Sequence, residues 1–266
     1  MNASSLYLGT SSWMVVGWET AFYPPRTKES DYLPFYAGRF NSVEIDSTFY
    51  RIPTAKTVQQ WRERTPEGFI FAAKLPQVIT HEKVLVGAEG DLKAFLGVMD
   101  LLGPKLGPLL IQLPYFNKQK FNGLDSFLRV LEPFLGSLPK GYQWAVEIRN
   151  RHWLSEKFFS VLRNHGVAFT LIDHPWMPRP NEVFQLGDPI TVGFTYVRWL
   201  GDRKGIEKRT LVWDRTIIDR REELREWVRI LKQLQERNIR IYGFINNHYA
   251  GFAPETVSLF NELWVE

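Results

Sequence analysis

The chain has 266 residues, of which 44% are hydrophobic and 23% are charged, and its formal net charge is +4. This balance is typical of a folded globular protein and excludes a disordered or fibrous one. The absence of cysteine excludes disulfides and thiolate metal sites. No apolar run approaches the roughly 20 residues of a membrane span, and the first five residues lack a signal-peptide pattern. We therefore expect a cytoplasmic protein with no membrane partner.

Short apolar segments alternate with segments of helical pattern along the whole chain. The predicted strands are Leu6–Thr10, Val43–Asp46, Phe69–Leu75, Pro108–Leu113, Trp144–Arg149, Val167–Ile172, Phe194–Trp199 and Ile239–Asn246. The predicted helices cover residues 28–38, 57–64, 92–102, 121–135, 155–165, 220–237 and 254–263. This alternation predicts an α/β fold, a (β/α)8 TIM-like barrel that forms a single domain over residues 1–266. The alternative is an open doubly wound sheet, but no phosphate-binding glycine pattern follows the first strand.

The segment 40–53, FNSVEIDSTFYRIP, contains the clearest sign of a site. Side chains two residues apart on a strand share a face, so Glu44 and Asp46 point the same way. A buried carboxylate is costly unless it is paired or hydrogen-bonded. Two of them on one face therefore predict a polar site at the end of this strand, next to the aromatic run that follows it.

Most predicted strands end in a polar or charged residue. In a parallel barrel these ends converge on one face, where the site forms. The polar residues at or near the strand ends are Glu44, Asp46, Lys74, Gln112, Glu147, Arg149, Asp173, Arg198, Asn246 and Asn247. Residues of the same parity before them are small or apolar, such as Ala72, Ala145 and Leu171. We predict a pocket in which four carboxylates nearly balance three cations; the alternative is a salt-bridged plug that only caps the barrel.

Chemical roles follow from the residue types. Glu147 is the candidate general acid or base, with Arg149 on the same strand face to hold its charge state, and Glu44 and Asp173 are the other catalytic candidates. Lys74 and Arg198 would neutralise an anionic group. The residues expected to contact the substrate are Trp13, Asp46, Tyr50, Lys74, His81, Gln112, Arg149, Arg198, Asn246 and Asn247.

Two further features bear on ligands. The segment Gly201–Arg209 is basic, contains two glycines and is predicted to be a flexible lid where barrels often bind phosphate. We expect no cofactor and no metal. A metal site is an alternative because four histidines follow strands, but HxH and HExxH spacings are absent and the nearby cations would repel a divalent ion.

Several stretches together resemble the YecE-like family, also called domain of unknown function 72. They include GTSSW at 9–13, FNSVEIDSTFYRIP at 40–53, LGPLLIQLP at 106–114, AVEIRNRHW at 145–153 and YVRWLG at 196–201. The resemblance covers essentially the whole chain and implies a TIM-like barrel without a settled activity, although a likeness to endonuclease-type barrels has been proposed for the family. The chain departs from the family pattern at Asp46, Tyr115 and Leu200.

Three functions are consistent with these observations. The first is an enzyme of the hydrolase or lyase type that acts on a polar, phosphorylated or sugar-containing small molecule at the carboxyl face of the barrel. The second is nucleic-acid processing, in which basic loops hold phosphates and aromatic side chains receive a base. The third is a non-catalytic barrel that binds a metabolite. The sequence does not determine the substrate or the oligomeric state.

Overall fold

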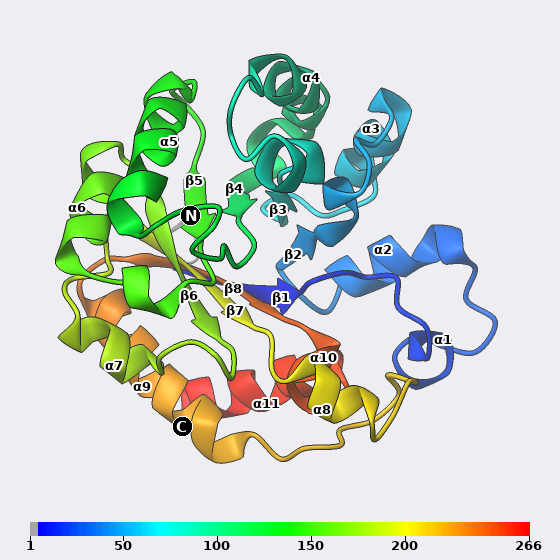
Figure 1. The fold of residues 1–266 in the computed structure, drawn as a ribbon. Helices are drawn as coiled ribbons and strands as arrows, with labels where there is room; N and C mark the ends of the chain where they lie inside the picture. The colour runs from blue at the N-terminus through cyan, green and yellow to red at the C-terminus, as the bar shows by residue number, and fades with distance from the viewer. Residues whose placement is uncertain (1–4) are drawn as a thin grey trace.

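The computed structural model describes residues 5–266 and contains eight parallel strands that curl into a nearly closed barrel (Figure 1). The strands are β1 (Leu6–Thr10), β2 (Ser42–Ile45), β3 (Ile70–Lys74), β4 (Leu106–Gln112), β5 (Trp144–Glu147), β6 (Ala168–Asp173), β7 (Phe194–Trp199) and β8 (Arg240–Ile245). Their hydrogen-bonded order is β1-β8-β7-β6-β5-β4-β3-β2. The predicted (β/α)8 barrel is therefore confirmed.

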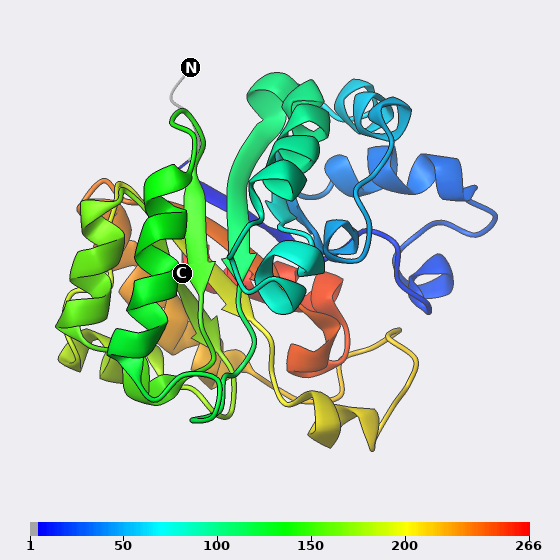
Figure 2. The same cartoon turned by 45° about the horizontal axis from the view of Figure 1, so that its top comes forward.

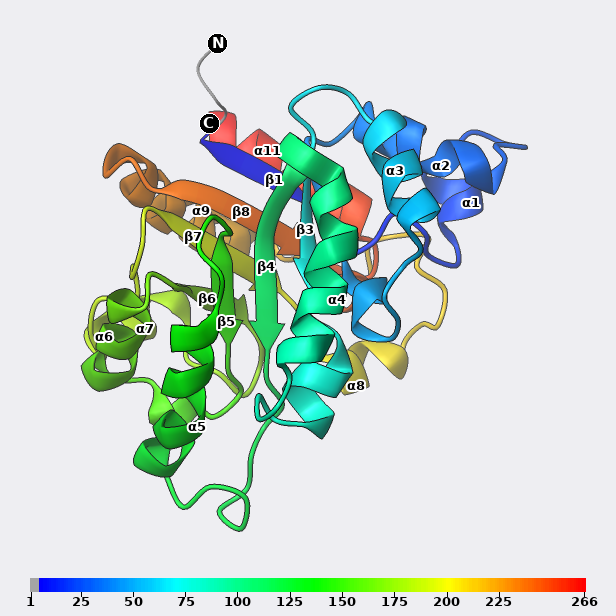
Figure 3. The same ribbon diagram turned by 90° about the horizontal axis from the view of Figure 1, so that it is seen from above.

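Helices connect the strands and surround them (Figures 1 and 3). The α-helices are α1 (Trp18–Ala21), α2 (Glu29–Ala37), α3 (Ala55–Glu63), α4 (Glu89–Met99), α5 (Leu124–Ser137), α6 (Glu156–Asn164), α7 (Pro180–Gln185), α8 (Arg203–Glu207), α9 (Arg221–Glu236), α10 (Asn247–Ala250) and α11 (Ala253–Val265). Short segments of other helix types are η1 (Asp46–Phe49), η2 (Val78–Glu82), η3 (Asp100–Lys105) and η4 (Arg151–Trp153). The predicted flexible lid at 201–209 instead contains α8.

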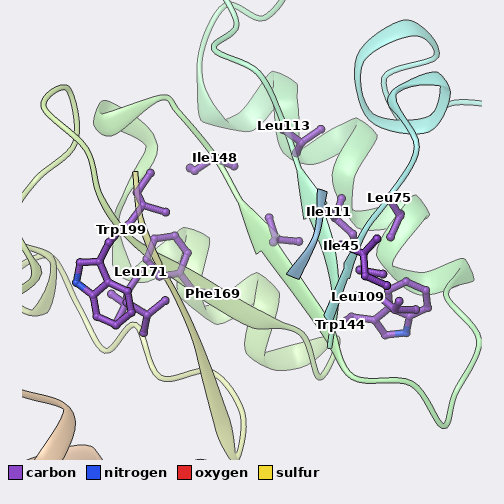
Figure 4. Close-up of a cluster of buried hydrophobic side chains, with 14 of the residues drawn as sticks. Ile45, Leu75, Leu109, Ile111, Leu113, Trp144, Ile148, Phe169, Leu171 and Trp199 are labelled. Atoms are coloured by element: carbon purple, nitrogen blue, oxygen red, sulfur yellow. The ribbon is translucent and has the colours of Figure 1, made fainter. Parts of the chain in front are cut away.

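The buried apolar side chains form two layers, one inside the barrel and one between the strands and the helices. The inner layer consists of Tyr7, Ala72, Leu110, Ala145, Ala168, Phe194, Tyr196, Tyr242 and Phe244. The outer layer is much larger, and Figure 4 shows part of it, including Ile111, Leu171 and Trp199. The prediction that Leu171 faces the barrel interior is wrong. In β6, Ala168 belongs to the inner layer, so Leu171, three residues later, points to the other face, toward the helices.

Side chains close the barrel where β1 and β2 meet without a backbone ladder. Asn41 accepts a hydrogen bond from Leu8 N at 2.9 Å and donates one to Leu6 O at 2.9 Å, so its amide substitutes for a strand partner. The hydroxyl of Tyr36 accepts from Thr10 N at 2.8 Å and donates to Ser42 O at 3.1 Å. A Cβ at Gly9 would lie 1.9 Å from Ser42 O, so only glycine allows this close approach.

The carboxyl ends of the strands all face one end of the barrel. In Figure 2 the arrowheads point toward the end at which α8 lies, drawn in yellow. At the back of the barrel, α11 packs against β1 and β8 (Figure 3). No helix among residues 5–266 is long and apolar enough to cross a membrane.

Candidate functional site

The centre of the site is Arg198, which β7 places inside the barrel near its carboxyl end. Its guanidinium donates to Glu44 Oε1 from Nε at 3.2 Å and from Nη2 at 2.8 Å, and to Glu147 Oε2 from Nη1 at 2.8 Å. Both carboxylates are fully buried, and Arg198 is 3% exposed. All three guanidinium nitrogens are thus used by protein carboxylates, so Arg198 organises the site and does not face an incoming anion.

Tyr196 is a site residue that the sequence interpretation missed. Its hydroxyl donates to Glu44 Oε2 at 2.5 Å, and its side chain is fully buried. Burial and the neighbouring charge of Glu44 raise the pKa of Tyr196 well above its usual range, so it remains a donor. Tyr196 and Arg198 are two residues apart on β7 and share a face. The two-residue alternation of the strand, which placed Arg198 in the site, places Tyr196 on the same face.

Glu147 is held by a second arginine from its own strand end. Arg149 donates to Glu147 Oε1 from Nε at 2.7 Å, and its Nη2 lies 2.6 Å from the same oxygen. Burial by itself would raise the pKa of Glu147, but Arg149 and Arg198 outweigh burial and lower it to about 2. Glu147 is therefore a permanent anion at neutral pH.

Lys74, at the end of β3, is the third cation of the site. Its Nζ lies 3.3 Å from Asp46 Oδ1 and 3.8 Å from the centre of the Phe49 ring. The side chain is 9% exposed, and burial lowers the pKa of Lys74, an effect that Asp46 offsets only in part and that Arg198 strengthens. An amine with a lowered pKa is suited to proton transfer, and a bound anion would stabilise its protonated form.

Glu44, Asp46, Lys74, Glu147, Arg149 and Arg198, hereafter the charged cluster, contain three carboxylates and three cations. Formal charge is therefore balanced, as expected for ions removed from water. Asp46 follows β2 in the turn η1, where its Oδ1 also lies 4.0 Å from Arg198 Nη2. Within residues 5–266, no group of three histidine, aspartate or glutamate side chains is arranged to hold a metal ion.

Two neutral histidines lie beside the charged cluster. Burial, together with the positive charges of Lys74 and Arg149, lowers the pKa of His81 to about 4. Its ring lies 4.8 Å from that of Phe49, which also contacts Lys74. Burial and then Arg149 lower the pKa of His174 to about 4, although Glu147 and Asp202 oppose the shift. His174, one of the four histidines after strands that the sequence offered as metal ligands, lies at this site.

The structure does not bring Asp173 into the charged cluster. Its Oδ2 accepts hydrogen bonds from Trp227 Nε1 at 2.8 Å and from Tyr249 OH at 3.2 Å, and Trp227 belongs to α9 in the outer layer. Asp173 and Leu171 are two residues apart on β6, so both side chains point away from the barrel interior, toward the helices. The expected fourth carboxylate of the pocket is thus a link between β6 and the surrounding helices.

Three more predicted site residues have structural contacts instead. Asn246 caps α10, where its Oδ1 accepts from His248 N at 3.0 Å. Asn247 Oδ1 accepts from Ala253 N at 2.9 Å and from Trp18 Nε1 at 3.3 Å. Trp13 is 8% exposed and packs edge-on against Trp61. None of the three is bonded to the charged cluster.

The remaining predicted residues lie near the charged cluster. Gln112 is 8% exposed, pairs with Glu147 in the strand register and donates to Leu113 O at 2.8 Å. Tyr50 is 70% exposed and packs edge-on against Phe49. Tyr50 therefore lies next to the ring that contacts Lys74, where a ligand could reach it.

The fold and this site define the class of the protein: a (β/α)8 barrel with a buried, charge-balanced cluster at the carboxyl end of its strands, where barrel proteins keep their ligand sites. Within that class, the chain belongs to the family described as "Protein of unknown function DUF72", which it matches over residues 7–266. The family resemblance inferred from the sequence motifs is confirmed.

Relatives and solved structures agree with this assignment. The chain is 26% identical to the UPF0759 protein YunF of Bacillus subtilis over 94% of this chain and 91% of that protein. It is 33% identical to the UPF0759 protein YecE of Escherichia coli over 50% of this chain and 46% of that protein. A DUF72 family protein from Thermotoga maritima superimposes with a TM-score of 0.75 at 26% identity, covering 98% of this chain and 99% of that one. A DUF72 protein from Enterococcus faecalis gives a TM-score of 0.71 at 20% identity, covering 98% and 96%, and shows the fold alone.

Proposed function

We propose that this protein is an enzyme of the hydrolase or lyase type that acts on a small polar compound with an anionic group. The observation that carries the proposal is that Lys74 and His81 lie on the same ring, that of Phe49, beside the charged cluster. Both have a lowered pKa, and the Phe49 ring contacts both. Groups with perturbed pKa values that share a pocket are typical of catalytic sites.

The geometry favours a division of roles within the site. Lys74 and Arg149 would bind the anionic group, because each retains some exposure and Arg149 Nη1 has no hydrogen bond to the described part of the chain. His81 Nδ1 is 2.8 Å from Thr80 Oγ1, whereas its Nε2 has no hydrogen-bond partner within residues 5–266. His81 Nε2 would accept the proton as general base.

Glu147 and Glu44 fit a supporting role better than proton transfer. A general base works best when its pKa is near the operating pH. The pKa of Glu147 is about 2, whereas that of His81 is about 4 without a ligand and would rise toward neutrality when an anion binds beside the ring. The hydrogen bonds of the two carboxylates to Arg198, 2.8 Å from Nη2 to Glu44 Oε1 and 2.8 Å from Nη1 to Glu147 Oε2, hold the guanidinium in place. The role of Glu147 as general acid or base stays a prediction, which the stability of its glutamine variant can test.

The first experiment measures whether an anion binds where we propose. In histidine NMR titrations without added anion, His81 should remain neutral at pH 6. A bound phosphate would place negative charge beside the ring, so 20 mM inorganic phosphate should raise the pKa of His81 by about one unit. The variant Lys74→Met should lose the phosphate effect, whereas Lys140→Met at the opposite end of the barrel should retain it. If the pKa of His81 in the unaltered protein is the same with and without phosphate, the anion site is contradicted.

The second experiment tests catalysis. A panel of sugar phosphates, phosphate esters and nucleotides is incubated with the protein, and turnover is followed by phosphorus NMR. We expect at least one compound to be converted, and His81→Asn to reduce the rate by about 100-fold or more because general base catalysis is lost. Tight binding without turnover of any compound would instead favour the metabolite-binding alternative. Strongly salt-dependent affinity for DNA, with no binding of the small compounds, would favour nucleic-acid processing.

A further inference from the structure

A cavity of about 690 Å³ lies beside the charged cluster, between the loops that follow β4, β5 and β6. We call it the aromatic pocket. It is lined by Tyr115, Phe116, Lys118, Phe121, Asn122, Gly123, Leu124, Arg149, Asn150, Arg151, His152, Trp153 and Trp176. Its volume is in the range of pockets that enclose small organic ligands.

The floor of the aromatic pocket is apolar and well ordered by its own contacts. The rings of Phe116 and Phe121 are 5.0 Å apart, and that of Phe116 stacks on Trp153 at 6.3 Å. Asn150 joins the two loops, since its amide donates to Phe116 O at 2.8 Å and its Oδ1 accepts from Phe116 N at 2.9 Å. The floor is therefore formed before any ligand arrives.

The rim carries two aromatic side chains that the fold does not bury. Tyr115 and Trp176 are each 66% exposed. Leaving large rings in water gives up the stabilisation that burial would provide, unless a ligand covers them. Trp176 also lies next to His174, with ring centres 5.3 Å apart, which connects this rim to the charged cluster.

The charges of the aromatic pocket have one sign. Lys118, Arg149 and Arg151 line it, and no aspartate or glutamate does. Arg149 belongs both to this pocket and to the charged cluster, where it is bonded to Glu147 through one edge of its guanidinium. The pocket therefore favours a ligand that combines negative charge with a planar apolar part.

We propose that the aromatic pocket binds the planar ring of a small nucleotide-like compound whose anionic group lies at Arg149 and Lys74. The inference rests on the proposed function and adds to it the substrate class. Aromatic side chains stack on planar bases, and the cations complement a phosphate. A neutral sugar fits less well, because no carboxylate lines the pocket to accept from its hydroxyls and the amide of Asn150 is already bonded to Phe116.

The test is calorimetric titration of the full chain with four probes: inorganic phosphate, ribose 5-phosphate, adenosine and adenosine 5′-monophosphate. The monophosphate should bind at least about tenfold more tightly than ribose 5-phosphate, because the base stacks in the aromatic pocket. The variants Trp176→Ala and Tyr115→Ala should remove most of that gain and leave the affinity for ribose 5-phosphate unchanged. Leu211→Ala is the matched control, since Leu211 is 72% exposed but does not line the pocket.

The outcomes separate this inference from the proposed function. Equal affinities for the monophosphate and ribose 5-phosphate, or a gain that survives both aromatic substitutions, would overturn the aromatic pocket while the anion site stands. If adenosine binds as tightly as its monophosphate and Trp176→Ala weakens that binding, the result supports the aromatic pocket and contradicts the anion site. Binding of a single-stranded oligonucleotide without any binding of the mononucleotide would overturn the inference in favour of a nucleic-acid surface.

Discussion

At the scale of single residues, the stability of the protein depends on the ion pairs that the buried Glu147 makes with Arg198 and Arg149. Glu147 accepts from Arg198 Nη1 at 2.8 Å and from Arg149 Nε at 2.7 Å, and neither Glu147 nor Arg198 is more than 3% exposed. Burying ions costs several kcal/mol, which the paired geometry offsets. Removal of one partner leaves the other charge without compensation, so the cluster is stable only as a whole.

The first prediction follows directly. Glu147→Gln should lower the free energy of unfolding by roughly 3–5 kcal/mol, because a buried cation loses its counter-ion. The control is Asp125→Asn, which breaks the exposed pair of Asp125 with Lys157, 71% and 60% exposed, and should cost far less than Glu147→Gln because water screens an exposed pair. Urea unfolding at pH 7 measures both. A cost near zero for Glu147→Gln would instead support the catalytic assignment, in which the native site is strained for function.

At the scale of elements, the junction of β1 with β2 is where the barrel is least regular. The two strands do not form a backbone ladder, and the side chains of Asn41 and Tyr36 supply the missing hydrogen bonds. Gly9 permits the approach because a Cβ there would overlap Ser42 O. These contacts fix the position of β2, so that Glu44 Oε1 lies 2.8 Å from Arg198 Nη2.

Replacing Tyr36 with phenylalanine tests this junction. The change removes the hydroxyl that accepts from Thr10 N and donates to Ser42 O, and both groups are buried. We expect a loss of about 1–3 kcal/mol in the free energy of unfolding, the cost of leaving buried polar groups unsatisfied. Tyr32→Phe is the control on the same helix, since Tyr32 stacks on Tyr23 but its hydroxyl bonds no group within residues 5–266. Equal losses for the two variants would show that the hydroxyl of Tyr36 does not close the barrel.

At the scale of the whole molecule, the site determines how stability depends on pH. The pKa of His81 and that of His174 are both lowered to about 4 from 6.5, and that of His248 is also lowered, chiefly by burial. Between pH 4 and 6.5 the unfolded chain therefore binds more protons than the folded one, so stability rises with pH. Glu147 acts in the same direction at lower pH, because its pKa of about 2 lies below the ordinary value of 4.5.

We therefore expect full stability from these groups above about pH 6.5, a decrease as the pH falls toward 4, and a second decrease between 4.5 and 2. The second step should be worth roughly 3 kcal/mol, the order of magnitude for a carboxylate shifted by two to three pKa units. Urea midpoints at pH 7, 5 and 3 measure this profile. In the double variant His81→Asn with His174→Asn, the first step should shrink and the second should remain. A profile that is flat from pH 7 to 4 would contradict the lowered histidine pKa values.

The amino-acid sequence by itself determined the barrel and much of its site. Apolar segments that alternate with helical ones specify parallel strands, and polar residues at strand ends must then meet on one face. Glu44, Lys74, Glu147 and Arg198 were predicted in this way and lie together, although Glu44 and Arg198 are separated by 154 residues. The reason is that a two-residue period and a closed sheet leave few other arrangements.

Only the tertiary structure decided the direction of individual side chains and the pairing of charges. The period of a strand says which residues share a face, but not which face is inside when both are apolar, as around Leu171. For that reason Asp173 was expected in the pocket, whereas it bonds Trp227 and Tyr249 outside it. Likewise, the lowered pKa of His81 and the aromatic pocket beside Arg149 arise from loops of several strands that come together only in space. Such contacts leave no local period in the sequence, since they depend on where the barrel closes.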